Sequence, residues 1–120
     1  MDQVTLCRID ALPDGGARGF DPLGRGHDTV FVVRQGGALH AYLDLCPHYG
    51  DTRLPWRKDA YLDAASEVIV CAAHGARFDI ATGRCTLGPC LGQSLKAVPL
   101  ELNDDGEVLA ATHDLQETTS

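Results

Sequence analysis

The sequence predicts an all-β fold, an antiparallel sandwich or small barrel, from two observations. Short runs of β-branched and aromatic residues alternate along the chain with clusters of Gly, Pro, Asn and Asp, as strands alternate with turns. No segment shows a sustained helical period with capping residues, although residues 57–66 leave room for one helical turn. Chains with many short strands and no long helix form sandwiches or barrels.

Seven strands are expected along the chain. The clearest covers residues 29–34, with the sequence Thr-Val-Phe-Val-Val-Arg, and the Gly-Gly pair at 36–37 joins it to the next strand as a hairpin. Asn-Asp-Asp-Gly at 103–106 is a second strong hairpin turn. The expected strands are residues 4–9, 29–34, 38–43, 68–70, 77–80, 96–102 and 107–111.

A chain of 120 residues, 44% of them hydrophobic, can bury a core of its own. We expect residues 1–112 to form one domain and residues 113–120 a polar, frayed tail. No apolar run approaches the roughly 20 residues that span a bilayer, and the first residues lack the pattern of a signal peptide. These features predict a cytoplasmic protein that binds no membrane and keeps its thiols reduced.

The charge and the cysteine count narrow the possible functions. A net charge of −7, from 17 acidic and 10 basic residues, argues against binding to nucleic acid. It would suit docking to a basic patch on a protein partner. The five cysteines are an odd number, so no complete disulfide framework is expected. Cys85 and Cys90 flank one short turn, and we expect two buried thiols there rather than a disulfide.

Two short motifs combine cysteine with histidine. Cys46-Pro47-His48 and Cys71-Ala72-Ala73-His74 each follow a strand-like run, so each pair should occupy a loop at the end of a sheet. Two such loops can face each other. Thiolate and imidazole ligands suit soft or borderline metals such as iron and zinc, and not calcium or magnesium. The interleaved order makes unrelated core thiols and surface histidines a poor explanation.

Two metal centres compete for these four ligands. One is structural zinc in a tetrahedral Cys₂His₂ site. The other is a [2Fe–2S] cluster in which two cysteines hold one iron and two histidines hold the other. Common zinc fingers place the two cysteines together and then the two histidines. Here each loop supplies one of each, and this order favours the cluster.

The residues around these motifs resemble the Rieske family. The sequences at 46–50 and 71–79 are similar to the two cluster loops of that family, and Gly-Pro-Cys-Leu at 88–91 is similar to its third, proline-bearing loop. The resemblance covers residues 30–111. It implies a Rieske-type fold with a cluster-binding subdomain over about residues 44–90. It also implies one cluster, with its inner iron on Cys46 and Cys71 and its outer iron on His48 and His74, near a surface where a partner docks.

One departure from the family is the distance between the two motifs. The 22 residues 49–70 separate His48 from Cys71, which is more than the family usually has. The extra residues are expected within 54–62. Surface loops tolerate insertions at little cost in free energy, so the longer spacing does not argue against the four ligands. Trp56 and Tyr61 lie in this segment and are expected to be apolar plugs rather than a shield or partner surface.

The loops also indicate which kind of Rieske centre this is. High-potential members of the family carry a second cysteine in each loop, joined as a disulfide, where this sequence has Asp51 and Ala73. They also carry Ser and Tyr hydroxyls where this sequence has Ala76 and Phe78, whose side chains cannot donate hydrogen bonds. Donors to the sulfurs raise the potential. We therefore expect the lower part of the Rieske range of about −150 to about +300 mV.

These properties imply an electron-transfer ferredoxin that carries electrons from a reductase to an oxygenase. We do not expect an enzyme, because four protein ligands saturate both irons and leave no position for substrate. A fixed Rieske small subunit of a larger, nitrite-reductase-like enzyme is the first alternative. A zinc-binding interaction module is the second.

Overall fold

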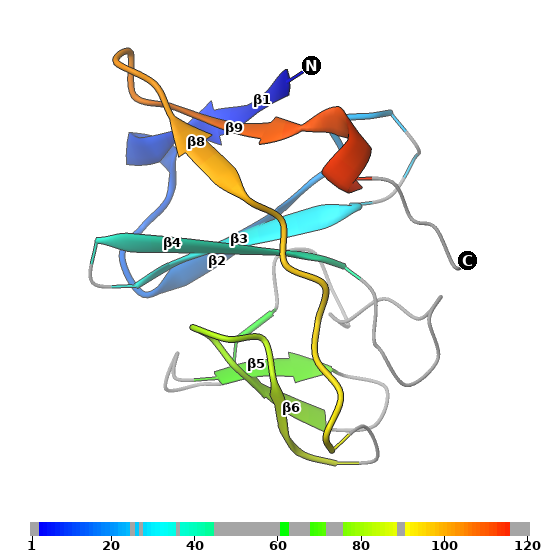
Figure 1. Cartoon of the computed structure of the whole chain (residues 1–120). Helices are drawn as coiled ribbons and strands as arrows, with labels where there is room; N and C mark the ends of the chain where they lie inside the picture. Colours follow the sequence, from blue (N-terminus) through cyan, green and yellow to red (C-terminus); the bar gives the residue numbers. More distant parts are fainter. Residues whose placement is uncertain are drawn as a thin grey trace.

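Three antiparallel sheets of three strands each make up the described part of the chain (Figure 1). The computed structural model describes residues 3–24, 26, 28–35, 37–44, 61–62, 68–71, 76–88 and 91–115. We call the sheets terminal (order β1-β9-β8), central (β2-β3-β4) and distal (β5-β6-β7). The elements are β1 (Gln3–Arg8), η1 (Ile9–Ala11), β2 (Gly16–Phe20), β3 (Val30–Gln35), β4 (Ala38–Leu43), β5 (Val68–Cys71), β6 (Ala76–Asp79), β7 (Cys85–Leu87), β8 (Leu100–Leu102), β9 (Glu107–Ala111) and η2 (Thr112–Leu115).

The central sheet is covered on both faces, because β3 carries apolar side chains in both directions. Its first four residues are all buried, and successive side chains of a strand point to opposite faces. Val30 and Val32 pack with the core of the terminal sheet, whereas Phe31 and Val33 pack with the core of the distal sheet. The central sheet therefore lies between the other two (Figure 1).

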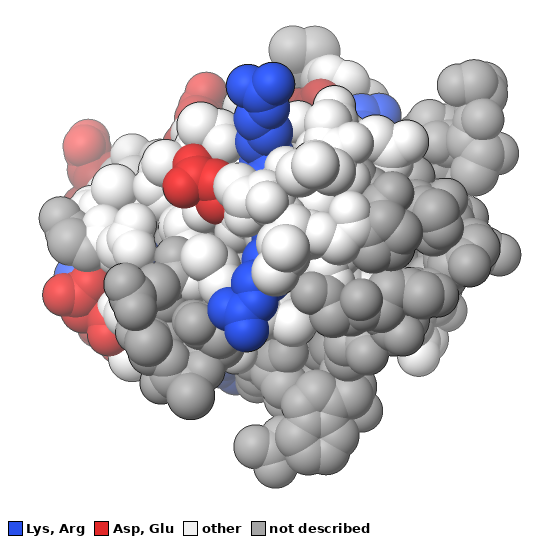
Figure 2. Space-filling model, turned by 90° about the horizontal axis from the view of Figure 1, so that it is seen from below, with Lys and Arg blue, Asp and Glu red and all other residues white. Residues whose placement is uncertain are grey.

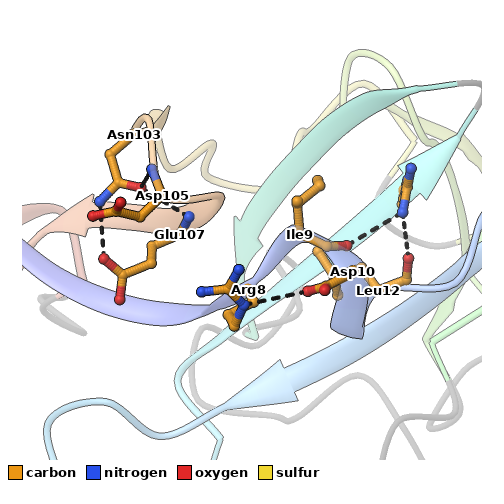
Figure 3. A network of polar contacts seen from close by, with 8 residues as sticks. Arg8, Ile9, Asp10, Leu12, Asn103, Asp105 and Glu107 are labelled. Atoms are coloured by element: carbon orange, nitrogen blue, oxygen red, sulfur yellow. Dashed lines mark hydrogen bonds and ion pairs between the residues drawn. The ribbon is translucent and has the colours of Figure 1, made fainter.

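The expected all-β antiparallel fold is confirmed. Six of the seven expected strands are found with bounds that agree within one residue. The β3–β4 hairpin pairs Gln35 with Ala38 around the Gly-Gly turn. At the second expected turn, the side-chain oxygen of Asn103 accepts the backbone N–H groups of Asp105 at 3.0 Å and Glu107 at 2.9 Å (Figure 3).

The seventh expected strand, residues 96–102, is divided between two sheets. Its first part pairs with β4, since Leu43 N donates to Lys96 O and Val98 N donates to Ala41 O, both at 2.9 Å. Its last part, β8, pairs with β9 in the terminal sheet. Pro99 lies between the two parts and has no N–H to continue a ladder.

Sequence reasoning missed β2 and β7. The β2 sequence, Gly-Ala-Arg-Gly-Phe, has two glycines and few residues that favour strands. It forms a strand because it pairs with the edge of β3. β7 has three residues, which is too short for a visible alternation. Of the residues proposed for a helical turn, 57–60 and 63–66 lie outside the described residues, and Leu62 forms an isolated bridge with Ile69.

The C-terminal segment differs from the expected polar tail, which was placed at 113–120. Thr112–Leu115 forms the 3₁₀ turn η2, and the Leu115 side chain is fully buried in the core of the terminal sheet. One leucine among polar residues provides enough apolar area to hold the turn against the sheet. Residues 116–120 lie outside the described residues.

Arg34 ties the connection after β1 to the central sheet. Its Nη1 donates to the carbonyl oxygen of Ile9 at 3.2 Å and to that of Leu12 at 2.8 Å, and so satisfies carbonyls around η1 (Figure 3). The exposed ion pair between Arg8 and Asp10, at 3.6 Å, contributes little by comparison. No helix within the described ranges is long and apolar enough to cross a membrane.

We predict that Leu115→Ala lowers the free energy of unfolding by about 2–5 kcal/mol, because it leaves a cavity in the core of the terminal sheet. Leu102→Ala is the control, since Leu102 is 56% exposed, and a change within about 0.5 kcal/mol is expected there. Denaturant unfolding of both variants provides the comparison. Equal effects would show that η2 does not pack as described.

Candidate metal centre

Cys71 is the one expected ligand among the described residues, and it lies at the end of a buried strand. It is the last residue of β5 and has no exposed surface. Its partner across the β5–β6 pair is Ala76. Residues 72–75, which include His74, connect these two strands. The second motif thus belongs to the end of a hairpin, as its position after a strand predicts.

Cys46, His48 and His74 lie outside the described residues. Asp44, directly after β4, is the last described residue before the first motif. β4 and β5 both run from left to right in Figure 1 and end on the same side of the molecule. Among the described residues, no three His, Cys, Asp or Glu side chains gather as for a metal ion. The four-ligand assignment therefore stays a prediction.

The walls around Cys71 are apolar. Ala76 and Phe78 on β6 are fully buried and share one core cluster with Cys71. These are the two positions at which the sequence predicted missing hydroxyl donors. Phe78 packs a phenyl ring without a hydroxyl in the core. Ala76 has only a methyl group at the end of the β5–β6 pair.

The segment after β7 packs directly against this hairpin end. Gly88 has a φ of +111°, and a Cβ placed on it would lie 2.8 Å from the Cα and 3.0 Å from the Cβ of Ala76. Only glycine permits this approach without a shift. Leu91 N donates to Gly88 O at 3.2 Å, so the chain at Leu91 returns close to Gly88, beside Cys71's partner Ala76. Sequence reasoning placed a third loop here, but nothing in the sequence singled out Gly88.

Cys85 and Cys90 were expected to be buried thiols. Cys85 is 3% exposed, and its Sγ donates to the carbonyl oxygen of Leu87 at 3.4 Å. Cys90 lies outside the described residues, so the state of the pair stays a prediction. Leu87 and Leu91 are 58% and 67% exposed.

The described residues fit one side of an iron–sulfur site. A buried cysteine offers a thiolate, the hairpin connection carries an imidazole three residues later, and the apolar surroundings exclude water from the sulfur. A family model described as the Rieske [2Fe-2S] domain matches residues 2–112. This chain belongs to the Rieske family. It therefore binds a [2Fe–2S] cluster. The family decides between the two metal centres in favour of the cluster and against structural zinc.

Relatives of this Rieske domain are electron carriers. The chain is 30% identical over 115 residues to the ferredoxin component of the alkene monooxygenase system of Xanthobacter autotrophicus, covering 96% of this chain and 85% of the relative. The ferredoxin of carbazole 1,9a-dioxygenase from Nocardioides aromaticivorans IC177 superposes with a TM-score of 0.71 at 32% identity, covering 92% and 98% of the two chains. The protein is an electron carrier with protein redox partners, as the sequence predicted, and not a catalytic subunit.

A more distant structure shares the fold alone. A protein described as the small subunit of an NADH-dependent nitrite reductase from Mycobacterium tuberculosis superposes with a TM-score of 0.64 at 19% identity, covering 91% and 93% of the two chains. Identity this low does not carry function from one chain to the other. The likeness therefore shows a shared fold and no more.

The charge at the distal end of this Rieske domain is mixed. Figure 2 views the molecule from below, the end at which the distal sheet lies in Figure 1. On the described part of this face, Lys and Arg side chains lie near the middle, and acidic side chains lie mostly toward one edge. The described part of this face is therefore less uniformly acidic than the net charge of −7 suggests. The net charge alone does not predict that a partner docking here is basic.

We predict that Gly88→Ala speeds loss of the cluster and lowers the free energy of unfolding of the holoprotein by about 1–3 kcal/mol through overpacking against Ala76. Gly92→Ala is the matched control. Gly92 also has a positive φ, of 92°, but a Cβ there would meet nothing within 4 Å. Both variants carry the backbone strain, and only Gly88→Ala carries the clash. Iron retention and denaturant unfolding measure the difference, and indistinguishable variants would contradict the packing argument.

Proposed function

We propose that this Rieske domain is a ferredoxin that passes single electrons from a reductase to an oxygenase, with Cys46, His48, Cys71 and His74 as its cluster ligands. The observation that carries the proposal is Cys71, buried at the end of β5 beside Ala76. In the proposed arrangement the cysteines hold the inner iron and the histidines hold the outer iron. The oxygenase acceptor is supported by two relatives, which are named as ferredoxins of oxygenase systems.

The protein's part in the reaction is to hold and insulate the cluster. When bound, the cluster accepts and releases one electron. The buried Cys71 thiolate is fixed by strand pairing on β5, so its position changes little when the charge of the site changes. Four protein ligands leave both irons saturated, so substrate oxidation takes place on the partner and not here.

We further propose a potential in the lower half of the Rieske range. Ala76 and Phe78 are fully buried and their side chains cannot donate hydrogen bonds, so these two side chains give the reduced, more negative cluster no stabilising donors. We expect voltammetry near pH 7 to find a midpoint below about +100 mV. A value above this would mean that other donors reach the sulfurs, and the low-potential assignment would be wrong.

The ligand assignment has a direct test. Purified wild-type protein is expected to be brown-red, to contain iron and sulfide, and to show the reduced-state electron paramagnetic resonance (EPR) signal of a Rieske cluster. Cys71→Ser and Cys46→Ser are expected to abolish or strongly alter that signal, whereas Cys7→Ser is the control, since Cys7 lies on β1 in the terminal sheet. A colourless, zinc-loaded wild-type protein, or an unchanged signal in Cys71→Ser, would reject the assignment.

Association state separates the carrier from a fixed subunit. A ferredoxin is expected to purify as a monomer and to meet its reductase and oxygenase in transient encounters. A permanent nitrite-reductase-like subunit would co-purify with its large partner. Cell fractionation would check the cytoplasmic location, which we propose from the sequence.

A further inference from the structure

Tyr61 adds a short segment to the edge of the distal sheet, next to the strand that ends in Cys71. Its backbone oxygen accepts the N–H of Val70 at 2.8 Å, and Val70 directly precedes Cys71. Leu62 forms an antiparallel bridge with Ile69. The backbone of Tyr61 and Leu62 therefore pairs with the strand that leads to the second cysteine.

The side chain of Tyr61 contacts Asp44, on the chain that leads to the other motif. Its hydroxyl donates to Oδ2 of Asp44 at 2.8 Å, and both side chains are buried, with exposures of 0% and 2%. Asp44 follows β4 and lies two residues before Cys46. The backbone N–H of Asp44 donates to Thr29 O at 3.0 Å, which fixes the end of β4 to the central sheet.

The ring of Tyr61 is held between the central and distal sheets. It stacks on Phe31 of β3 with ring centroids 4.2 Å apart and an interplanar angle of 11°. Gly19 on β2 leaves room for the hydroxyl, because a Cβ at that position would overlap Tyr61 Oη and Asp28 Oδ2. The tyrosine is thus constrained from the ring, the hydroxyl and the backbone at once.

We propose that Tyr61 is a positioning residue that sets the stems of both cluster loops relative to each other. Through its hydroxyl it holds the residue two before Cys46, and through its backbone it holds the residue before Cys71. Tyr61 thereby links the central and distal sheets. This inference rests on the proposed ligand assignment, and it goes beyond that assignment by giving Tyr61 a role.

The chain offers a matched control in Tyr42. Its hydroxyl donates to Ile80 O at 2.6 Å, and its ring lies 5.9 Å from the same Phe31 ring. Like Tyr61, it is buried between the central and distal sheets. Its hydroxyl bonds the chain after β6, however, and not a stem of either motif. Tyr42→Phe and Tyr61→Phe therefore remove the same kind of bond from the same core.

The experiment compares the two holoproteins with wild type. We expect both variants to lower the melting temperature by similar amounts, because each loses one buried hydrogen bond. Only Tyr61→Phe is expected to release iron to a chelator about tenfold faster and to shift or broaden the reduced-state EPR signal. Gly19→Ala places a Cβ against the Tyr61 hydroxyl and the Asp28 carboxylate, and we expect it to change iron release and the EPR signal in the same direction as Tyr61→Phe.

Two results would overturn the positioning role. One is a Tyr61→Phe protein whose iron release and EPR signal match those of wild type. The other is a Tyr42→Phe protein that changes as much as Tyr61→Phe, which would make both effects general destabilisation. Failure of the ligand assignment looks different, because the wild-type protein itself would then lack a Rieske signal or keep it in Cys71→Ser.

Discussion

Burial of β3 on both faces is the constraint on which the rest of this structure depends. A strand with apolar side chains in both directions must be covered from both sides, since leaving either face in water forfeits about 25 cal/mol for each Å² of apolar surface. Val30 and Val32 pack in the core of the terminal sheet, and Phe31 and Val33 pack in the core of the distal sheet. The three-sheet arrangement follows from one run of four residues.

Aromatic contacts and tyrosine hydrogen bonds join the distal sheet to the central sheet. Phe31 stands between Tyr42 and Tyr61, and each tyrosine hydroxyl makes a buried hydrogen bond. Burial, and after it the nearby charge of Asp79, raise the pKa of the Tyr42 phenol above its ordinary value. Aromatic contacts provide area and the hydrogen bonds provide direction. These contacts give the small distal sheet a fixed orientation relative to the central sheet.

This foundation explains how a Rieske domain of 120 residues can place a thiolate in a dry environment. Cys71 ends a strand inside the core shared by two sheets, so its surroundings are set by packing rather than by loop conformation. An electron carrier benefits, because a rigid apolar wall limits rearrangement when one charge is added.

The sequence by itself determined the local features: six strands, both hairpin turns, the two Cys-His motifs and the family. These depend on neighbouring residues, because alternation, Gly pairs and ligand spacing are read within a few positions. The tertiary structure alone decided β2, the packing of Gly88 on Ala76, the burial of Leu115 and the bond between Tyr61 and Asp44. Each of these joins segments distant along the chain, and a contact between such segments leaves no periodic signal in either one.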